Sequence, residues 1–224
     1  MEPAWHAYPA TYADGHGTEH APLFNDGRTL VVTIRDIHFS GKDFDALEPP
    51  FGTDPSNLVH FTLNGRDLCG CMIACDMPQV ICTSTPAPGR FLGTLHVAVH
   101  LGMPARDGGI ISEIVKLELI YGEWHFHSRG SGSLFETELL DLKKQLPAGH
   151  YFLNCFGCAF SDYFYGGQRL FGSMACFREC KTEYLAVRTK DDYIAMFDKN
   201  AGLVQETNIC PQFQPRCANT GYRG

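Results

Sequence analysis

The chain has 224 residues, of which 44% are hydrophobic and 12% aromatic. This composition excludes a disordered chain, and the length suffices for one hydrophobic core without disulfide bonds. The formal charge of −7, with no run of Lys or Arg, argues against nucleic acid or an anionic membrane as a partner. Met1–His6 does not resemble a secretory signal, and no segment has the ~20 apolar residues that span a bilayer. We therefore expect a cytoplasmic protein whose ten cysteines are reduced thiols or metal ligands.

Residues 1–27 contain three histidines, three prolines and two Asp-Gly pairs, with little hydrophobic periodicity. Turn-forming residues without periodicity are typical of a loosely attached segment. We expect a flexible N-terminal arm here. A metal site formed by His6, His16 and His20 is the alternative that we disfavour.

Residues 28–148 have the pattern of a β-rich domain. Thr29–Phe39 is rich in β-branched residues, and Asn64-Gly65 between two apolar runs predicts a hairpin turn. Phe91–Leu101 and Glu113–Tyr121 alternate apolar with polar residues, which predicts strands with one buried face. Strands at regular spacing, separated by Gly and Pro, favour a mainly β fold, an antiparallel sandwich or barrel.

The segment Glu123-Trp-His-Phe-His127 suggests a second kind of site. On a strand, Glu123, His125 and His127 share one face, with the two histidines ~7 Å apart. Such a pair can chelate a transition metal and leave coordination positions open for water or substrate. A third ligand would come from a neighbouring strand, and the candidates are His38, His60, His96 and His100. The alternative, which we favour, is a polar outer face with Trp124 and Phe126 toward the core.

Two helices are expected in the second half of the chain. Ser133-Leu-Phe-Glu136 has the form of a capping box, and an apolar stripe at helical spacing follows it. The stripe consists of Phe135, Leu139, Leu142 and Leu146. Pro147 ends this helix. A shorter helix is expected after Thr189, because Asp191 and Asp192 favour the positive end of a helix dipole. Its buried face would be Tyr193, Ile194 and Phe197.

Residues 149–224 are rich in cysteine, and we expect them to form a metal-binding module packed on the β-rich domain. A C-x-x-C turn places two thiolates on one side of a tight knuckle, and two more complete a tetrahedron around zinc. We predict a structural zinc ion bound by Cys155, Cys158, Cys176 and Cys210, with Cys180 and Cys217 as substitutes. Reduced thiols in the core and disulfides are the alternatives. A thioredoxin-like role for the pair is disfavoured, because a βαβ context is missing.

The other cysteines, Cys69, Cys71, Cys75 and Cys82, form a separate group. On one strand, Cys69 and Cys71 would point to the same side and could chelate a metal. Buried cysteine is also a small hydrophobic residue. We favour packing over a second thiolate site.

The segments Cys155–Tyr163 and Phe171–Arg178, together with the end Thr220–Gly224, resemble the signature of a bacterial family of uncharacterised proteins. The resemblance is specific over residues 133–224 and loose before them. It implies that Cys155, Cys158, Cys176 and Cys210 belong together, and it implies no activity. In this chain Phe164-Tyr165 replaces the Ser-Pro-type turn of the family.

Two functions are compatible with these patterns. No nucleophile elbow, phosphate-binding loop or H-E-x-x-H motif occurs in the sequence. The first function is therefore a binding or regulatory module with a structural zinc, acting on a protein or small-molecule partner. The alternative is a metalloenzyme of a specialised-metabolite pathway, with an open metal site at His125 and His127.

Overall fold

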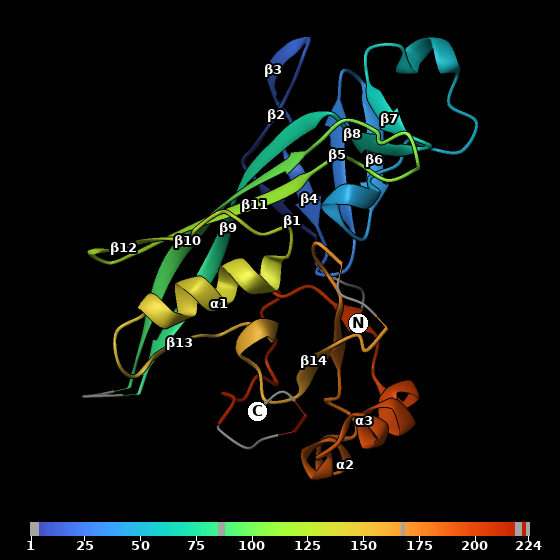
Figure 1. Cartoon of the computed structure of the whole chain (residues 1–224). Helices are drawn as coiled ribbons and strands as arrows, with labels where there is room; N and C mark the ends of the chain where they lie inside the picture. Colours follow the sequence, from blue (N-terminus) through green and yellow to red (C-terminus); the bar gives the residue numbers. More distant parts are fainter. Residues whose placement is uncertain (1–4, 85–87, 167–168, 218–220, 223–224) are drawn as a thin grey trace.

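The computed structural model describes residues 5–84, 88–166, 169–217 and 221–222. Antiparallel strands form sheets of seven, four, three and two strands, and the helices are few and short (Figure 1). The predicted mainly β, antiparallel fold is confirmed. None of the helices in the described residues is long and apolar enough to cross a membrane.

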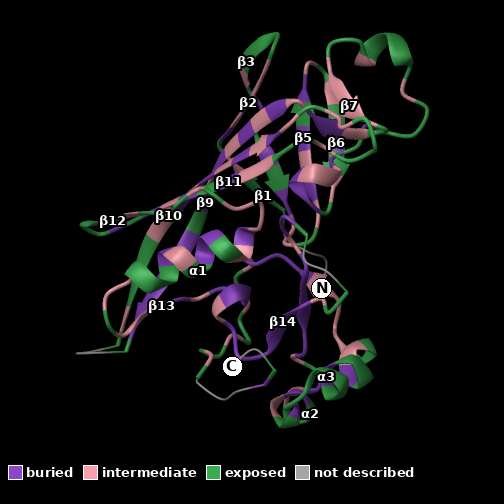
Figure 2. Ribbon diagram, viewed as in Figure 1, coloured by how far each residue is buried: buried purple, intermediate pink, exposed green. Residues whose placement is uncertain are grey.

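The seven-stranded sheet forms the centre of the molecule. Its strands are β2 (Ala10–Asp14), β3 (Gly17–His20), β9 (Cys71–Thr83), β10 (Gly89–Leu101), β11 (Glu113–Tyr121), β12 (Trp124–His127) and β13 (His150–Phe152). They run in the order β12-β11-β10-β9-β2-β3, with β13 beside β9. Leu95 stands opposite Met77 and Leu119, and all three are fully buried. Figure 2 shows buried and less buried residues alternating along β10 and β11, as the period-two pattern predicts.

The expected flexible N-terminal arm is wrong for residues 6–25, because they form four strands. β1 (His6–Tyr8) and β4 (Leu23–Asn25) join β5 (Leu30–Ile34) and β6 (Ile37–Gly41) in the four-stranded sheet. β2 pairs with β9 in the large sheet, and Tyr12 on β2 is 1% exposed. Strands of three to five residues are too short to show a periodic pattern, and their partners lie far along the chain. The hairpin predicted at Asn64-Gly65 is confirmed by β7 (Thr62–Asn64) and β8 (Asp67–Cys69).

Helix α1 (Phe135–Gln145) packs beneath the large sheet (Figure 1). Phe135, Leu139 and Leu142 are fully buried, which confirms most of the predicted stripe, whereas Leu146 lies beyond the helix. The predicted capping box at Ser133 is not formed: the N-cap is Leu134, without a side-chain bond. Glu138 instead binds the preceding loop, because its buried carboxylate accepts bonds from the N–H groups of Gly130 and Gly132 at 2.8 and 3.0 Å.

Residues after 152 form the cysteine-rich part of the chain. Its elements are η3 (Cys155–Gly157), β14 (Ser161–Tyr163), β15 (Met174–Cys176), α2 (Lys181–Ala186), α3 (Lys190–Met196), η4 (Phe197–Lys199) and β16 (Leu203–Val204). Two further short helices, η1 (Phe44–Ala46) and η2 (Pro55–Leu58), precede the long strands. The predicted helix after Thr189 is confirmed as α3, and Thr189 and Asp192 form a capping box. Its buried face is partly different, because Met196 is buried and Ile194 is 39% exposed.

Two hydrophobic clusters form the core. The larger one joins the sheets, α1 and residues of the cysteine-rich part such as Phe156 and Phe171. The smaller one lies within that part, around Phe177, Tyr184 and Tyr193. The cysteine-rich part is therefore attached to the β-rich part through shared core residues and through β13.

Candidate metal centres

The Cys155-Phe-Gly-Cys158 segment folds as a tight turn. Cys155–Gly157 is the 3-10 helix η3, and the side chain of Asn154 caps it by accepting the N–H of Gly157 at 3.2 Å. A Cβ atom at Gly157 would lie 2.3 Å from the carbonyl oxygen of Phe152, so glycine is required at this close approach. The backbone that carries the sulfurs of Cys155 and Cys158 is therefore fixed by the Asn154 cap and by its close contact with Phe152.

The C-terminal segment returns to this turn and brings Cys210 beside it. The N–H of Cys155 bonds to the carbonyl of Asn208 at 2.9 Å, and the N–H of Ala159 bonds to that of Gln214 at 2.8 Å. Cys210 lies between these two anchors. Cys176 comes from β15, where it stands opposite Ser161 in register. The structure thus places all four predicted zinc ligands around one turn.

Each of these four sulfurs has an N–H donor. Backbone N–H groups two residues further along the chain donate to Cys158 (from Phe160, 3.5 Å), to Cys210 (from Gln212, 3.4 Å) and to Cys176 (from Arg178). The side-chain amide of Asn208 donates to Cys155 at 3.6 Å. Hydrogen bonds that point at sulfur stabilise the charged thiolate rather than the thiol.

Burial and mutual repulsion work against these donors. Burial raises the pKa of the Cys155 thiol, and the neighbouring sulfurs of Cys176, Cys158 and Cys210 raise it further. The pKa of Cys176 is raised by burial too, while the N–H and the charge of Arg178 lower it. Four thiolates in this position would need a cation to balance their charge.

Cys180 and Cys217, the predicted substitutes, each donate a thiol hydrogen bond to a backbone carbonyl. The Cys180 thiol donates to the carbonyl of Lys199 at 3.5 Å, and the Cys217 thiol donates to that of Pro215 at 3.9 Å. A carbonyl oxygen favours the protonated thiol and disfavours a metal-bound thiolate. All ten cysteines lie within the described residues, and none forms a disulfide.

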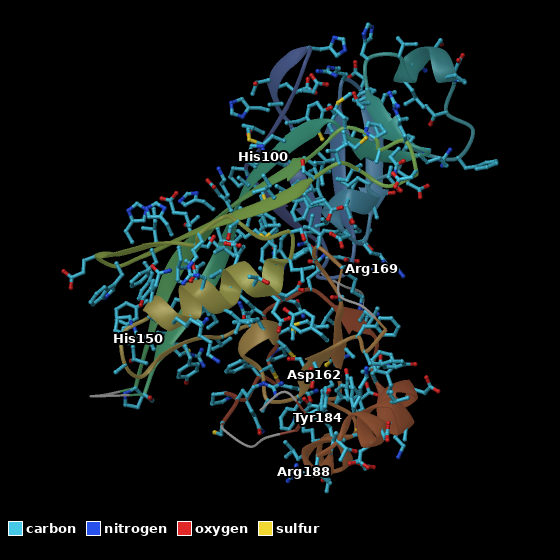
Figure 3. The ribbon with its side chains drawn as sticks, viewed as in Figure 1. His100, His150, Asp162, Arg169, Tyr184 and Arg188 are labelled. Carbon is cyan, nitrogen blue, oxygen red and sulfur yellow. The ribbon has the colours of Figure 1, made fainter. Side chains whose placement is uncertain are left out.

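The cysteine-rich turn is anchored by a buried polar group. Asp162 is 3% exposed and accepts the hydroxyl of Tyr184 at 2.9 Å, and these two residues lie close together in Figure 3. Arg216 donates to the carbonyl of Cys158 at 3.0 Å. These contacts connect the turn to α2 and to the C-terminal segment.

The N-terminal group of cysteines belongs to the hydrophobic core. Cys69, Cys71 and Cys75 are each less than 10% exposed, and all three are part of the larger cluster. Cys69 and Cys71 do not share a strand, because Gly70 turns between β8 and β9 with φ of 61°. Burial is the main cause of the raised pKa of Cys75. These observations support packing rather than metal binding.

His125 and His127 lie on β12 at the edge of the large sheet, and their third partner is Glu118 on β11. Among the described residues, only this trio places three His, Cys, Asp or Glu ligand atoms within 4.8 Å of one another. Glu118 stands opposite His127 in register and contacts the ring of His125. No three of the sulfurs of Cys155, Cys158, Cys176 and Cys210, all of which the structure describes, lie within 4.8 Å of one another. Binding of one zinc ion by all four would therefore require these side chains to move closer together.

The other residues considered for this site lie elsewhere. Glu123 precedes β12, and the predicted third ligands His38, His60, His96 and His100 are not part of the trio. Trp124 stacks on Phe126, with 5.9 Å between the ring centroids. Because Trp124 is 40% exposed, the predicted core-facing position of these two rings is only partly met. Sequence reasoning missed Glu118 because cross-strand register decides its position. The alternation of Glu113–Tyr121, which places Glu118 outward, was the available signal.

Comparison with known proteins identifies the family. Residues 6–161 match the model described as "Family of unknown function (DUF6304)". No curated protein and no solved structure matches the chain. The match includes Cys155, Cys158 and the Glu118 trio, and it ends before Cys176 and Cys210. Thr220, Arg223 and Gly224, at the end of the predicted signature, lie outside the described residues. Because the matched residues make up more than half of the chain, the chain belongs to this family of unknown function.

Proposed function

We propose that the protein is a binding module whose cysteine-rich part is held together by one structural zinc ion on Cys155, Cys158, Cys176 and Cys210. The observation that carries this proposal is the set of N–H donors, one on each of these four sulfurs. Cys180 and Cys217 instead face carbonyl oxygens. The contrast with Cys180 supports thiolates at the four proposed ligand positions and a protonated thiol at Cys180.

A zinc ion would balance the charge of four thiolates at these positions. As thiolates, the buried Cys155, Cys158 and Cys176 and the half-buried Cys210 would repel one another, and they would stabilise the fold only with a metal ion that balances their charge. Four thiolates also close the tetrahedral coordination shell, so no position remains for a substrate. The role of the ion is therefore structural, and binding to a protein or small-molecule partner takes place elsewhere on the surface.

Metal analysis of single variants tests the proposal. We expect the untagged protein to hold zinc at the cysteines, and we expect Cys155→Ser, Cys158→Ser, Cys176→Ser and Cys210→Ser each to lose it and to melt at lower temperature. Cys180→Ser and Cys217→Ser are matched controls that retain zinc. The proposal is wrong if all four ligand variants fold and hold zinc as the controls do.

A further inference from the structure

Separate from the thiolate module, a polar row crosses the outward face of the large sheet. Asp76, His96, Glu118 and His127 stand opposite one another in register on β9, β10, β11 and β12. His125 lies two residues from His127, on the same face of β12. We propose that Glu118, His125 and His127 bind a divalent first-row transition metal ion and leave part of its coordination shell open.

The distances within the trio suit a shared ion. One carboxylate oxygen of Glu118 contacts Nε2 of His125, and the other lies 3.8 Å from Nδ1 of His127. The two imidazole ring centroids are 4.3 Å apart. Zinc binds carboxylate oxygen and imidazole nitrogen at ~2.0–2.2 Å. An ion between the three ligand atoms therefore requires side-chain adjustment and no change of strand register.

Hydrogen bonding alone does not account for all three residues. His125 has a direct partner in Glu118, but 3.8 Å between His127 and Glu118 is too long for a hydrogen bond. His127 nevertheless points its nitrogen toward the same carboxylate while its side chain is 64% exposed. A metal ion gives both imidazoles a role, because each becomes a ligand.

The chemistry of the donors and the shape of the surface indicate an open site. Two histidines and one carboxylate are the protein ligands of one class of catalytic zinc site and of many non-haem iron sites, where water or a small ligand fills the remaining positions. Glu118 and His127 also line a groove of about 610 Å³, together with His96 and Lys116. His96 is held apart from the trio, since its Nδ1 contacts Asp76 at 2.5 Å. His100 lies further along β10 (Figure 3).

Counting zinc in untagged protein tests the site. After equilibration with Zn²⁺ and removal of excess metal, we expect the double variant His125→Ala/His127→Ala to hold one zinc ion fewer than the wild type. The matched control His6→Ala/His38→Ala removes two other exposed imidazoles and keeps the wild-type count. Glu118→Gln preserves the shape of the side chain and should weaken Zn²⁺ binding at this site at least about tenfold.

The two metal proposals fail independently. If the cysteine variants lose zinc while His125→Ala/His127→Ala and Glu118→Gln keep the wild-type count and affinity, the open site is refuted and the thiolate module stands. If the only zinc of the wild type disappears with the histidines, the open site stands and the module is refuted. Circular dichroism checks the fold of each variant; His125 and His127 are exposed on the edge strand β12, and Glu118→Gln keeps the size of its half-buried side chain.

Discussion

The buried carboxyl group of Asp43 should make the stability of this protein depend on pH. Asp43 lies between β6 and η1, and its side chain is fully buried. One carboxylate oxygen accepts the N–H of Phe44 at 2.7 Å, and the other accepts the N–H of Phe171 at 3.0 Å. Burial raises the pKa of Asp43 to about 9, and the nearby Asp45 and Glu206 add to the rise.

The direction of this pH dependence follows from the protonation of Asp43 in the folded and in the unfolded chain. In the unfolded chain an aspartate has a pKa of about 3.9, so between about pH 4 and about pH 9 the folded state keeps a proton that the unfolded state releases. The contribution of Asp43 to the free energy of unfolding is therefore full below pH ~4 and falls by up to about 1.4 kcal/mol per pH unit above it. Asp43→Asn removes the contribution of Asp43, whereas the neighbouring Asp45, whose pKa burial also raises, remains titratable.

Asp43→Asn also lowers the free energy of unfolding by an amount that does not change with pH. Asparagine has one acceptor oxygen where Asp43 has two, so either Phe44 or Phe171 loses the partner of its buried N–H. A lost bond of this kind costs about 1–3 kcal/mol. We expect Asp43→Asn to be less stable than the wild type near pH 5, with the gap narrowing or reversing near pH 8.

Urea unfolding followed by far-UV circular dichroism at several pH values measures this gap. Asp191→Asn, at an exposed position, is the matched control and should follow the wild type throughout. A gap between Asp43→Asn and the wild type that stays constant from about pH 5 to about pH 8 would refute the reasoning.

Two further predictions concern the backbone. Arg35 and Asp36 form the turn between β5 and β6 with φ of 48° and 63°, a conformation that favours glycine. Asp36→Gly should therefore raise the free energy of unfolding by about 0.5–1 kcal/mol in urea titrations, and a decrease would contradict this. Gly157→Ala places a methyl group against the Phe152 carbonyl and should lower both the melting temperature and the zinc content. Gly15→Ala, which meets no atom within 4 Å, is its control, and equal behaviour of the two variants would contradict the close approach.

Features that depend on neighbouring residues can be predicted from the amino-acid sequence alone. The alternation along Phe91–Leu101 and Glu113–Tyr121 predicts β10 and β11, because successive side chains of a strand point to opposite faces. The turn at Asn64-Gly65 and the helix after Thr189 follow from local backbone preferences. The choice of Cys155, Cys158, Cys176 and Cys210 as zinc ligands, made from their spacing and from the family resemblance, stays a prediction.

The contacts between distant segments, by contrast, are visible only in the folded chain. Tyr12 is buried because β2 pairs with β9, some 60 residues later, and three- to five-residue strands contain too little pattern to reveal this. Glu138 is buried on α1 because the preceding loop brings two backbone N–H groups to its carboxylate. Glu118 joins His125 and His127 through cross-strand register, and Cys210 reaches Cys155 because the chain returns at Asn208. Local patterns follow from backbone sterics and the period of burial, whereas pairing between distant segments depends on which faces can be buried together.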